Sequence, residues 1–101
     1  MNDKELLELA AKAIGFTYEW GRVWDGESRY NWEPLVSAND AMDLMVKLQL
    51  DILFYEDQVE CIANTGNESL EPFAMVPYGD DKHAAVRMAI VMVAAEIGKK
   101  L

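Results

Sequence analysis

The chain has few of the residues from which reactive and metal-binding sites are built. Among its 101 residues there is one cysteine, Cys61, and one histidine, His83. A single cysteine cannot form an internal disulfide, which agrees with a reducing compartment, and a single histidine excludes a histidine-rich metal site. The sequence also contains no Gly-x-Ser-x-Gly, Gly-x-x-x-x-Gly-Lys, Gly-x-Gly-x-x-Gly or Cys-x-x-Cys motif. We therefore expect no enzyme activity, no catalytic residue, no metal site and no cofactor.

Basic residues are scarce as well. Nine Lys and Arg stand against 18 Asp and Glu, which gives a formal net charge of -9. Sequence-independent binding of DNA or RNA depends on Lys and Arg neutralising phosphates, and anionic membrane surfaces attract basic segments. The charge therefore predicts no direct nucleic-acid partner and no membrane partner.

No apolar run is long enough to cross a bilayer, which needs about 20 residues. The most apolar stretch lies within residues 83–101, where Met88 to Ala95 are eight consecutive apolar residues. A helix without a polar face must be enclosed by other elements, so these residues predict a central core helix. The first residues, Met1 to Glu5, lack the pattern of a secretory signal, and we expect a cytoplasmic protein.

The remaining patterns predict one α+β domain spanning residues 1–101. Apolar residues at helical spacing, each run preceded by a capping residue, predict helices near residues 3–14 and 37–49. Residues 16–20 are expected to form a strand, and residues 50–55, 59–63 and 70–76 a three-stranded antiparallel meander. The predicted order is α-β-α-β-β-β-α, with an antiparallel three- to four-stranded sheet and three helices. Both faces of the strand 50–55 are largely apolar, which predicts a sheet covered at least partly on both sides. Pro72 places the last strand at an edge or next to a bulge.

Residues 21–35 carry three large aromatic side chains in a stretch that otherwise reads as a loop. Trp24, Tyr30 and Trp32 either fold back as a lid over the core or form a binding surface. A lid would bury them, whereas a surface would offer anchors to a protein partner. Both alternatives stay open at this point.

The second half of the sequence is acidic over a long interval. Between Lys47 and Lys82 there is no basic residue, and the acidic residues there are Asp51, Glu56, Asp57, Glu60, Glu68, Glu71, Asp80 and Asp81. They either maintain solubility and protect strand edges or form a one-signed surface that docks on a basic partner. The candidate binding surface comprises Trp24, Tyr30, Trp32, Glu56, Asp57, Glu60, Glu68 and Glu71. Asp80, Asp81 and His83 could coordinate an ion in principle, but carboxylates at the start of a helix are far more often caps.

Several short motifs resemble a known family. They are Trp32-Glu33-Pro34-Leu35, the pattern Asp-Ala-x-x-Leu-x-x-x-Leu beginning at Asp40, and the closing segments Ala85 to Val91 and Ala94 to Lys99. With these motifs the chain resembles the small phage and prophage proteins grouped as the phage alpha-beta-alpha sandwich domain. The resemblance implies a bacteriophage accessory protein in the cytoplasm of a host cell, and it carries over no biochemical activity and no functional residue.

These observations favour a protein that acts by contact with other proteins. The first expectation is a partner from the phage or the host, or self-association as a homodimer. The alternative is an acidic anti-host or anti-defence inhibitor that docks on a basic, nucleic-acid-binding protein. Raised salt should weaken an acidic contact far more than an apolar one.

Overall fold

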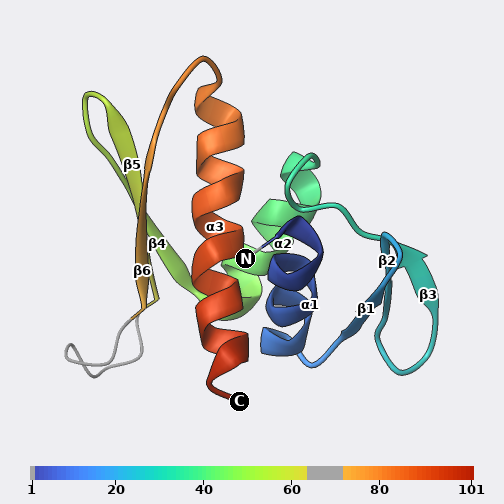
Figure 1. The fold of residues 1–101 in the computed structure, drawn as a ribbon. Helices are drawn as coiled ribbons and strands as arrows, with labels where there is room; N and C mark the ends of the chain where they lie inside the picture. The colour runs from blue at the N-terminus through green and yellow to red at the C-terminus, as the bar shows by residue number, and fades with distance from the viewer. Residues whose placement is uncertain (1, 64–71) are drawn as a thin grey trace.

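A computed structural model describes residues 2–63 and 72–101. Its elements follow the order α-β-β-β-α-β-β-β-α (Figure 1). The helices are α1 (Asp3–Ala13), α2 (Ala38–Leu48) and α3 (Lys82–Lys99), and the strands are β1 (Thr17–Glu19), β2 (Arg22–Trp24), β3 (Arg29–Asn31), β4 (Leu50–Phe54), β5 (Gln58–Ala63) and β6 (Phe73–Pro77). The α+β class and the three helices agree with the prediction from the sequence.

The closing helix α3 is the centre of the molecule, as predicted. In Figure 1 it stands between the sheet formed by β4, β5 and β6 on one side and helices α1 and α2 on the other. Eight of its residues are buried, namely Ala85, Ala89, Ile90, Val91, Val93, Ala94, Ala95 and Gly98. Most of these side chains are small, so the neighbouring elements can approach the helix axis closely. The lack of a polar face in the sequence therefore reflects a helix that is covered on several sides.

Side-chain oxygens cap all three helices at their N-termini. Asn2 accepts a hydrogen bond from the Glu5 N–H at 2.9 Å, and Ser37 accepts one from the Asp40 N–H. A capping box, in which Asp40 would also accept the N–H of Ser37, is only half formed at α2. The Asp40 carboxylate accepts the N–H of Glu33 at 2.8 Å instead of reaching back to Ser37. Asp40 thus ties the preceding loop to the first turn of α2.

Two separate antiparallel sheets replace the single sheet that the sequence suggested. The predicted meander is present as sheet B, in the order β4-β5-β6, and β6 begins at an edge directly after Pro72. Residues 21–35, predicted to be a loop, contain β2 and β3, which pair with β1 to form sheet A. Each strand of sheet A has only three residues, so the alternation of apolar and polar side chains is too short to be recognised in the sequence.

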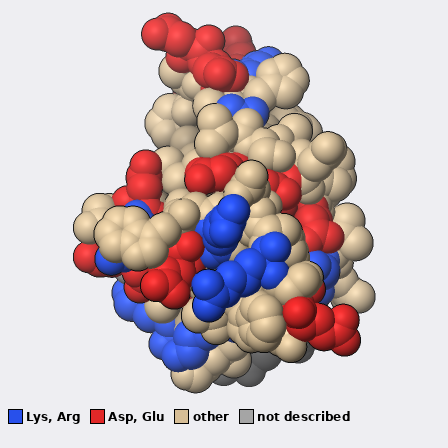
Figure 2. Space-filling view, turned by 90° about the vertical axis from the view of Figure 1, so that its right-hand side faces the viewer, with Lys and Arg blue, Asp and Glu red and all other residues tan. Residues whose placement is uncertain are grey.

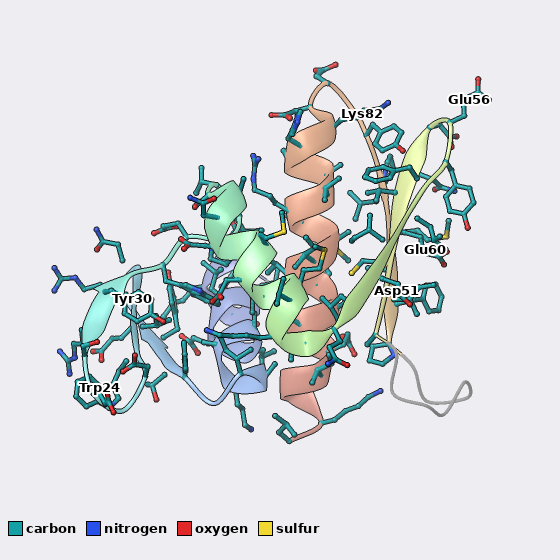
Figure 3. The ribbon with its side chains drawn as sticks, turned by 180° about the vertical axis from the view of Figure 1, so that it is seen from behind. Trp24, Tyr30, Asp51, Glu56, Glu60 and Lys82 are labelled. Carbon is teal, nitrogen blue, oxygen red and sulfur yellow. The ribbon has the colours of Figure 1, made fainter. Side chains whose placement is uncertain are left out.

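Sheet B is covered on one face only within the described residues, which corrects the expectation of cover on both sides. Its inner face carries Leu50, Val59, Cys61, Ala63 and Ala74, all buried in the core with α3. The outer face points away from α3 and meets no other element of the described chain (Figure 3). Among the described residues, no helix is both long and apolar enough to cross a membrane.

Candidate interaction surfaces

The first candidate site is the outer face of sheet B. Strand register places its side chains in three rows across the sheet. The rows are Asp51, Ile62 and Phe73; Leu53, Glu60 and Met75; and Tyr55, Gln58 and Pro77. We call these nine residues the acidic sheet face.

Large apolar side chains on the acidic sheet face remain exposed. Leu53, Tyr55, Phe73 and Met75 are between 40% and 62% exposed. Exposed apolar side chains that are grouped on one face are typical of surfaces that bind another molecule. The only charged residues of the face are Asp51 and Glu60. The arrangement therefore combines an apolar centre with carboxylates and contains no cation.

The β4–β5 hairpin extends this acidic character to its tip, where Glu56 and Asp57 lie (Figure 3). The Tyr55 hydroxyl donates a hydrogen bond to Glu60 Oε1 at 3.0 Å, and this bond to a carboxylate raises the pKa of Tyr55. The Tyr78 hydroxyl donates to the Tyr55 carbonyl oxygen at 2.6 Å. These bonds hold Tyr55 in place on the face. The predicted site residues Glu68 and Glu71 lie outside the described residues.

Of the three aromatic residues in segment 21–35, one is buried as a lid over the core and two lie on the surface. Trp32 is 1% exposed and belongs to the core, where its ring lies 6.0 Å from that of Tyr18. It acts as the lid and cannot contribute to a surface. Trp24 is 42% exposed and Tyr30 is 37% exposed. Only these two of the three remain available to a partner.

Trp24 lies on a second exposed face, the outer face of sheet A. Register aligns Thr17, Trp24 and Arg29 in one row and Glu19, Arg22 and Asn31 in the next. The Arg29 guanidinium lies 5.9 Å from the centre of the Trp24 ring. A hollow of about 280 Å³ runs over this face. We call these six residues, together with Trp20, the Trp–Arg face.

Trp20 is the most unusual residue of the Trp–Arg face. It is 80% exposed and has a φ of +52°, and Gly21 after it has a φ of +79°. Two such residues between β1 and β2 form the type I′ hairpin turn, which favours Asn-Gly. A tryptophan in this left-handed conformation costs roughly 1–2 kcal/mol. The Lys4 ammonium of α1 lies 5.1 Å from the centre of the Trp20 ring, and most of the side chain remains accessible to another molecule.

Arg22 and Arg29 were missed as site residues from the sequence. No Lys–Arg cluster was visible around Trp24 because the two arginines are seven positions apart, and pairing of β2 with β3 brings both onto one face. The signal was present in the alternating triplets Arg-Val-Trp and Arg-Tyr-Asn. Figure 2, which views the end of the molecule that carries sheet A, shows Lys and Arg side chains gathered in the middle of this surface with Asp and Glu around them.

The predicted surface residues do not form one site. The acidic sheet face and the Trp–Arg face lie at opposite ends of the molecule, with the helices between them (Figures 1 and 3). Trp24 and Tyr30 therefore cannot contact the same small epitope as Glu56, Asp57 and Glu60. The chain carries two separate candidate surfaces of different charge.

A third feature is an apolar groove of about 320 Å³ between α2, the end of β4 and the first half of α3. Met42, Met45, Phe54, Val86 and Ile90 are among its lining residues, and Lys82, His83 and Arg87 lie along α3. Arg87 Nε donates to the Leu35 carbonyl oxygen at 2.9 Å, which joins α3 to the loop before α2. The lining contains no combination of nucleophile and base.

The remaining candidates for chemistry have structural roles. Cys61 is buried, and burial together with the nearby Asp51 carboxylate raises the pKa of its thiol to about 12. A thiol at that pKa is inert near neutral pH. Asp81 caps α3 by accepting the N–H of Ala84 at 3.0 Å. Within residues 2–63 and 72–101, no three His, Cys, Asp or Glu side chains are grouped closely enough to hold a metal ion.

Comparison with known proteins adds no relative. No family model matches the chain, and no curated protein or solved structure is significantly similar to it. Any functional inference must therefore be made from the surfaces themselves.

Proposed function

We propose that this chain is a small phage or prophage accessory protein that acts by docking on another protein through its acidic sheet face. The observation that carries the proposal is the outer side of sheet B, which no other described element covers and where Leu53, Phe73 and Met75 are exposed. Burying such side chains against a partner is favourable by about 25 cal/mol for each Å² of apolar surface removed from water. The phage origin is supported by the sequence motifs that resemble the phage alpha-beta-alpha sandwich domain.

Charge narrows the chemistry of the partner. Asp51 and Glu60 lie among the apolar side chains, and Glu56 and Asp57 extend the same charge along the hairpin. Two copies of the acidic sheet face brought together would place like charges against each other, which opposes a symmetric dimer through this face. A fitting partner presents apolar side chains surrounded by Lys or Arg.

The proposal can be tested by placing a photo-crosslinking amino acid at Phe73 and, as a matched control, at Val46, which is 63% exposed on α2. We expect a discrete protein adduct from host-cell lysate at position 73 and none at position 46. Purified, that partner should bind the wild-type chain less tightly as salt rises and should bind a Glu60→Arg variant at least tenfold more weakly. Equal crosslinking at both positions, or a partner indifferent to Glu60→Arg, would refute docking through this face.

The alternative function is that of an inhibitor of a nucleic-acid-binding protein. It is favoured by the complete lack of Lys and Arg between residues 48 and 81, because an acidic face can occupy a basic surface made for phosphates. If this alternative holds, the purified partner should lose its nucleic acid when the wild-type chain is added and keep it when Glu60→Arg is added. Retention of nucleic acid in both cases would leave simple docking as the function.

A further inference from the structure

The Trp–Arg face has the residue types of a protein-binding hot spot. Trp, Tyr and Arg are the side chains that most often dominate binding energy at interfaces, and Trp20, Trp24, Arg22 and Arg29 lie together here. Neither arginine makes a salt bridge in the part of the chain that the structure describes. The guanidinium groups are therefore free for carboxylates of another molecule.

The charge of the face selects the kind of partner. Arg22, Arg29 and Glu19 give the two rows of sheet A a net charge of +1, from two positive groups and one negative group. Asp25 and Glu27 lie in the adjoining β2–β3 turn, where Asp25 accepts the N–H groups of Glu27 and Ser28. A long polyanion would meet these carboxylates and the net charge of -9. A partner surface with a few carboxylates among apolar side chains fits better than a nucleic acid.

The chain itself presents such a surface at its other end. The acidic sheet face has a net charge of -2, from Asp51 and Glu60, and exposes Leu53, Phe73 and Met75. We propose that the molecule self-associates head to tail, the Trp–Arg face of one copy docking on the acidic sheet face of the next. The inference rests on the proposed function, since it names a second copy as one occupant of that docking face.

The position of the two faces determines the form of the assembly. A contact between two different patches is heterologous, and it forms a ring or an open chain. The faces lie at opposite ends of the molecule in Figure 1, which favours an open chain of copies. Within the assembly, each copy uses its Trp–Arg face to bind one neighbour and its acidic sheet face to bind the other. A free acidic sheet face remains only on the copy at one end. Self-association would therefore compete with a foreign partner for the same face.

The contact is small and must be weak. Strands of three to six residues, spaced about 4.8 Å apart, provide only a few hundred Å² on each side, less than the roughly 800 Å² per partner of stable complexes. We expect a dissociation constant on the order of 100 µM for each contact. The association should weaken as salt rises, because it depends on charge at partly exposed groups.

Two single-face variants test the proposal by sedimentation between 10 µM and 1 mM. Arg29→Glu disables the Trp–Arg face, and Glu60→Arg disables the acidic sheet face. We expect wild type to grow beyond a dimer with concentration and each variant alone to stay monomeric. An equimolar mixture of the two should grow again, because the two unchanged faces pair as in wild type and the two altered faces carry exchanged charges. The double variant with both changes should recover growth, because the two charges are exchanged. Lys99→Glu serves as a control with the same charge change at the exposed end of α3 and should behave as wild type.

Trp20→Asn separates association from folding. Asparagine suits the left-handed turn position, so this variant should melt at the same temperature as wild type or higher, yet associate roughly 30-fold more weakly if Trp20 is an interface anchor. Unchanged association of Trp20→Asn, a wild type that stops at a dimer, or a mixture that stays monomeric would each overturn the proposal. Binding of oligo(dT) that is lost with Trp20→Asn would assign the face to nucleic acid instead.

These outcomes are distinct from those of the proposed function. A wild type that stays monomeric at 1 mM overturns the head-to-tail contact, but it leaves crosslinking of a foreign partner at position 73 intact. Loss of that crosslinking would overturn the docking face itself.

Discussion

The packing of α1 against α3 depends on the absence of a single methyl group. Gly98 is buried in the last turn of α3, opposite α1. A Cβ atom built on Gly98 would lie 1.9 Å from the Leu9 carbonyl oxygen and 2.8 Å from its carbonyl carbon. Both atoms belong to the backbone, so no side chain can rotate out of the way. A Gly98→Ala variant must therefore move one helix relative to the other.

The expected cost follows from the size of that movement. Ordinary contact begins near 3.4 Å, so the helices must separate locally by about 1.5 Å. A gap of even 0.5–1 Å forfeits a quarter to a half of the dispersion energy of the contacts involved. Overpacking of this kind costs about 1–3 kcal/mol or more, and the backbone collision places Gly98→Ala at the upper end. Because alanine favours the helix over glycine by about 1 kcal/mol, we expect a net loss of about 2 kcal/mol in the free energy of unfolding.

Urea unfolding followed by circular dichroism measures this loss. With an m value of about 1 kcal/mol/M for a chain of this size, the midpoint should fall by about 2 M. Lys99→Ala, at the next and exposed position, should leave the midpoint nearly unchanged. If Gly98→Ala were as stable as wild type, the close approach of α1 and α3 described above would be incorrect.

Three further predictions follow from burial and capping. Trp32→Ala should lower the free energy of unfolding by about 3–5 kcal/mol, as expected for a buried aromatic residue, whereas Trp24→Ala should change it by less than about 1 kcal/mol; similar losses by urea unfolding would contradict the division between lid and surface. Asp81→Ala removes the carboxylate that caps α3 and should cost about 1 kcal/mol, while Asp80→Ala should cost little; a thermal melt that ranks them in reverse order would contradict the cap. Burial raises the pKa of the Cys61 thiol from 9.0 to about 12. Between these two pH values the thiol keeps its proton in the folded chain and loses it in the unfolded chain. The free energy of unfolding should therefore fall as the pH rises from about 9 to about 12. The fall should be smaller in Cys61→Ala, and equal pH profiles from urea unfolding would refute this reasoning.

The sequence predicted the parts of the fold that depend on long, regular patterns. The eight apolar residues from Met88 to Ala95 identified the central helix. A helix that is apolar on every side can be kept from water only when other elements surround it. The capping residues before α1, α2 and α3 located the helix starts, since each supplies an oxygen to an otherwise unpaired N–H. Short turns between strands predicted the meander of sheet B.

Sheet A could not be predicted in the same way. Its strands have three residues each, so the period-2 alternation covers barely more than one repeat. Trp20 at the turn also conceals the hairpin, because asparagine or aspartate before glycine is the usual signal. The same obstacle hid the arginines of the candidate site, which share a face only after β2 and β3 pair.

The acidic residues illustrate the limit of charge patterns without geometry. Their continuity from Asp51 to Asp81 was plain in the sequence, yet they divide by location: Asp81 caps a helix, Glu56 and Asp57 lie at a hairpin tip, and Glu60 lies among exposed apolar side chains. Only the environment of Glu60 combines a charge with exposed apolar side chains, whose burial against another molecule would be favourable. A strand with two largely apolar faces predicted at least partial cover on both sides, and among residues 2–63 and 72–101 the structure supplies it on one side only. That missing cover, more than the net charge, is the physical reason to expect a second molecule on sheet B.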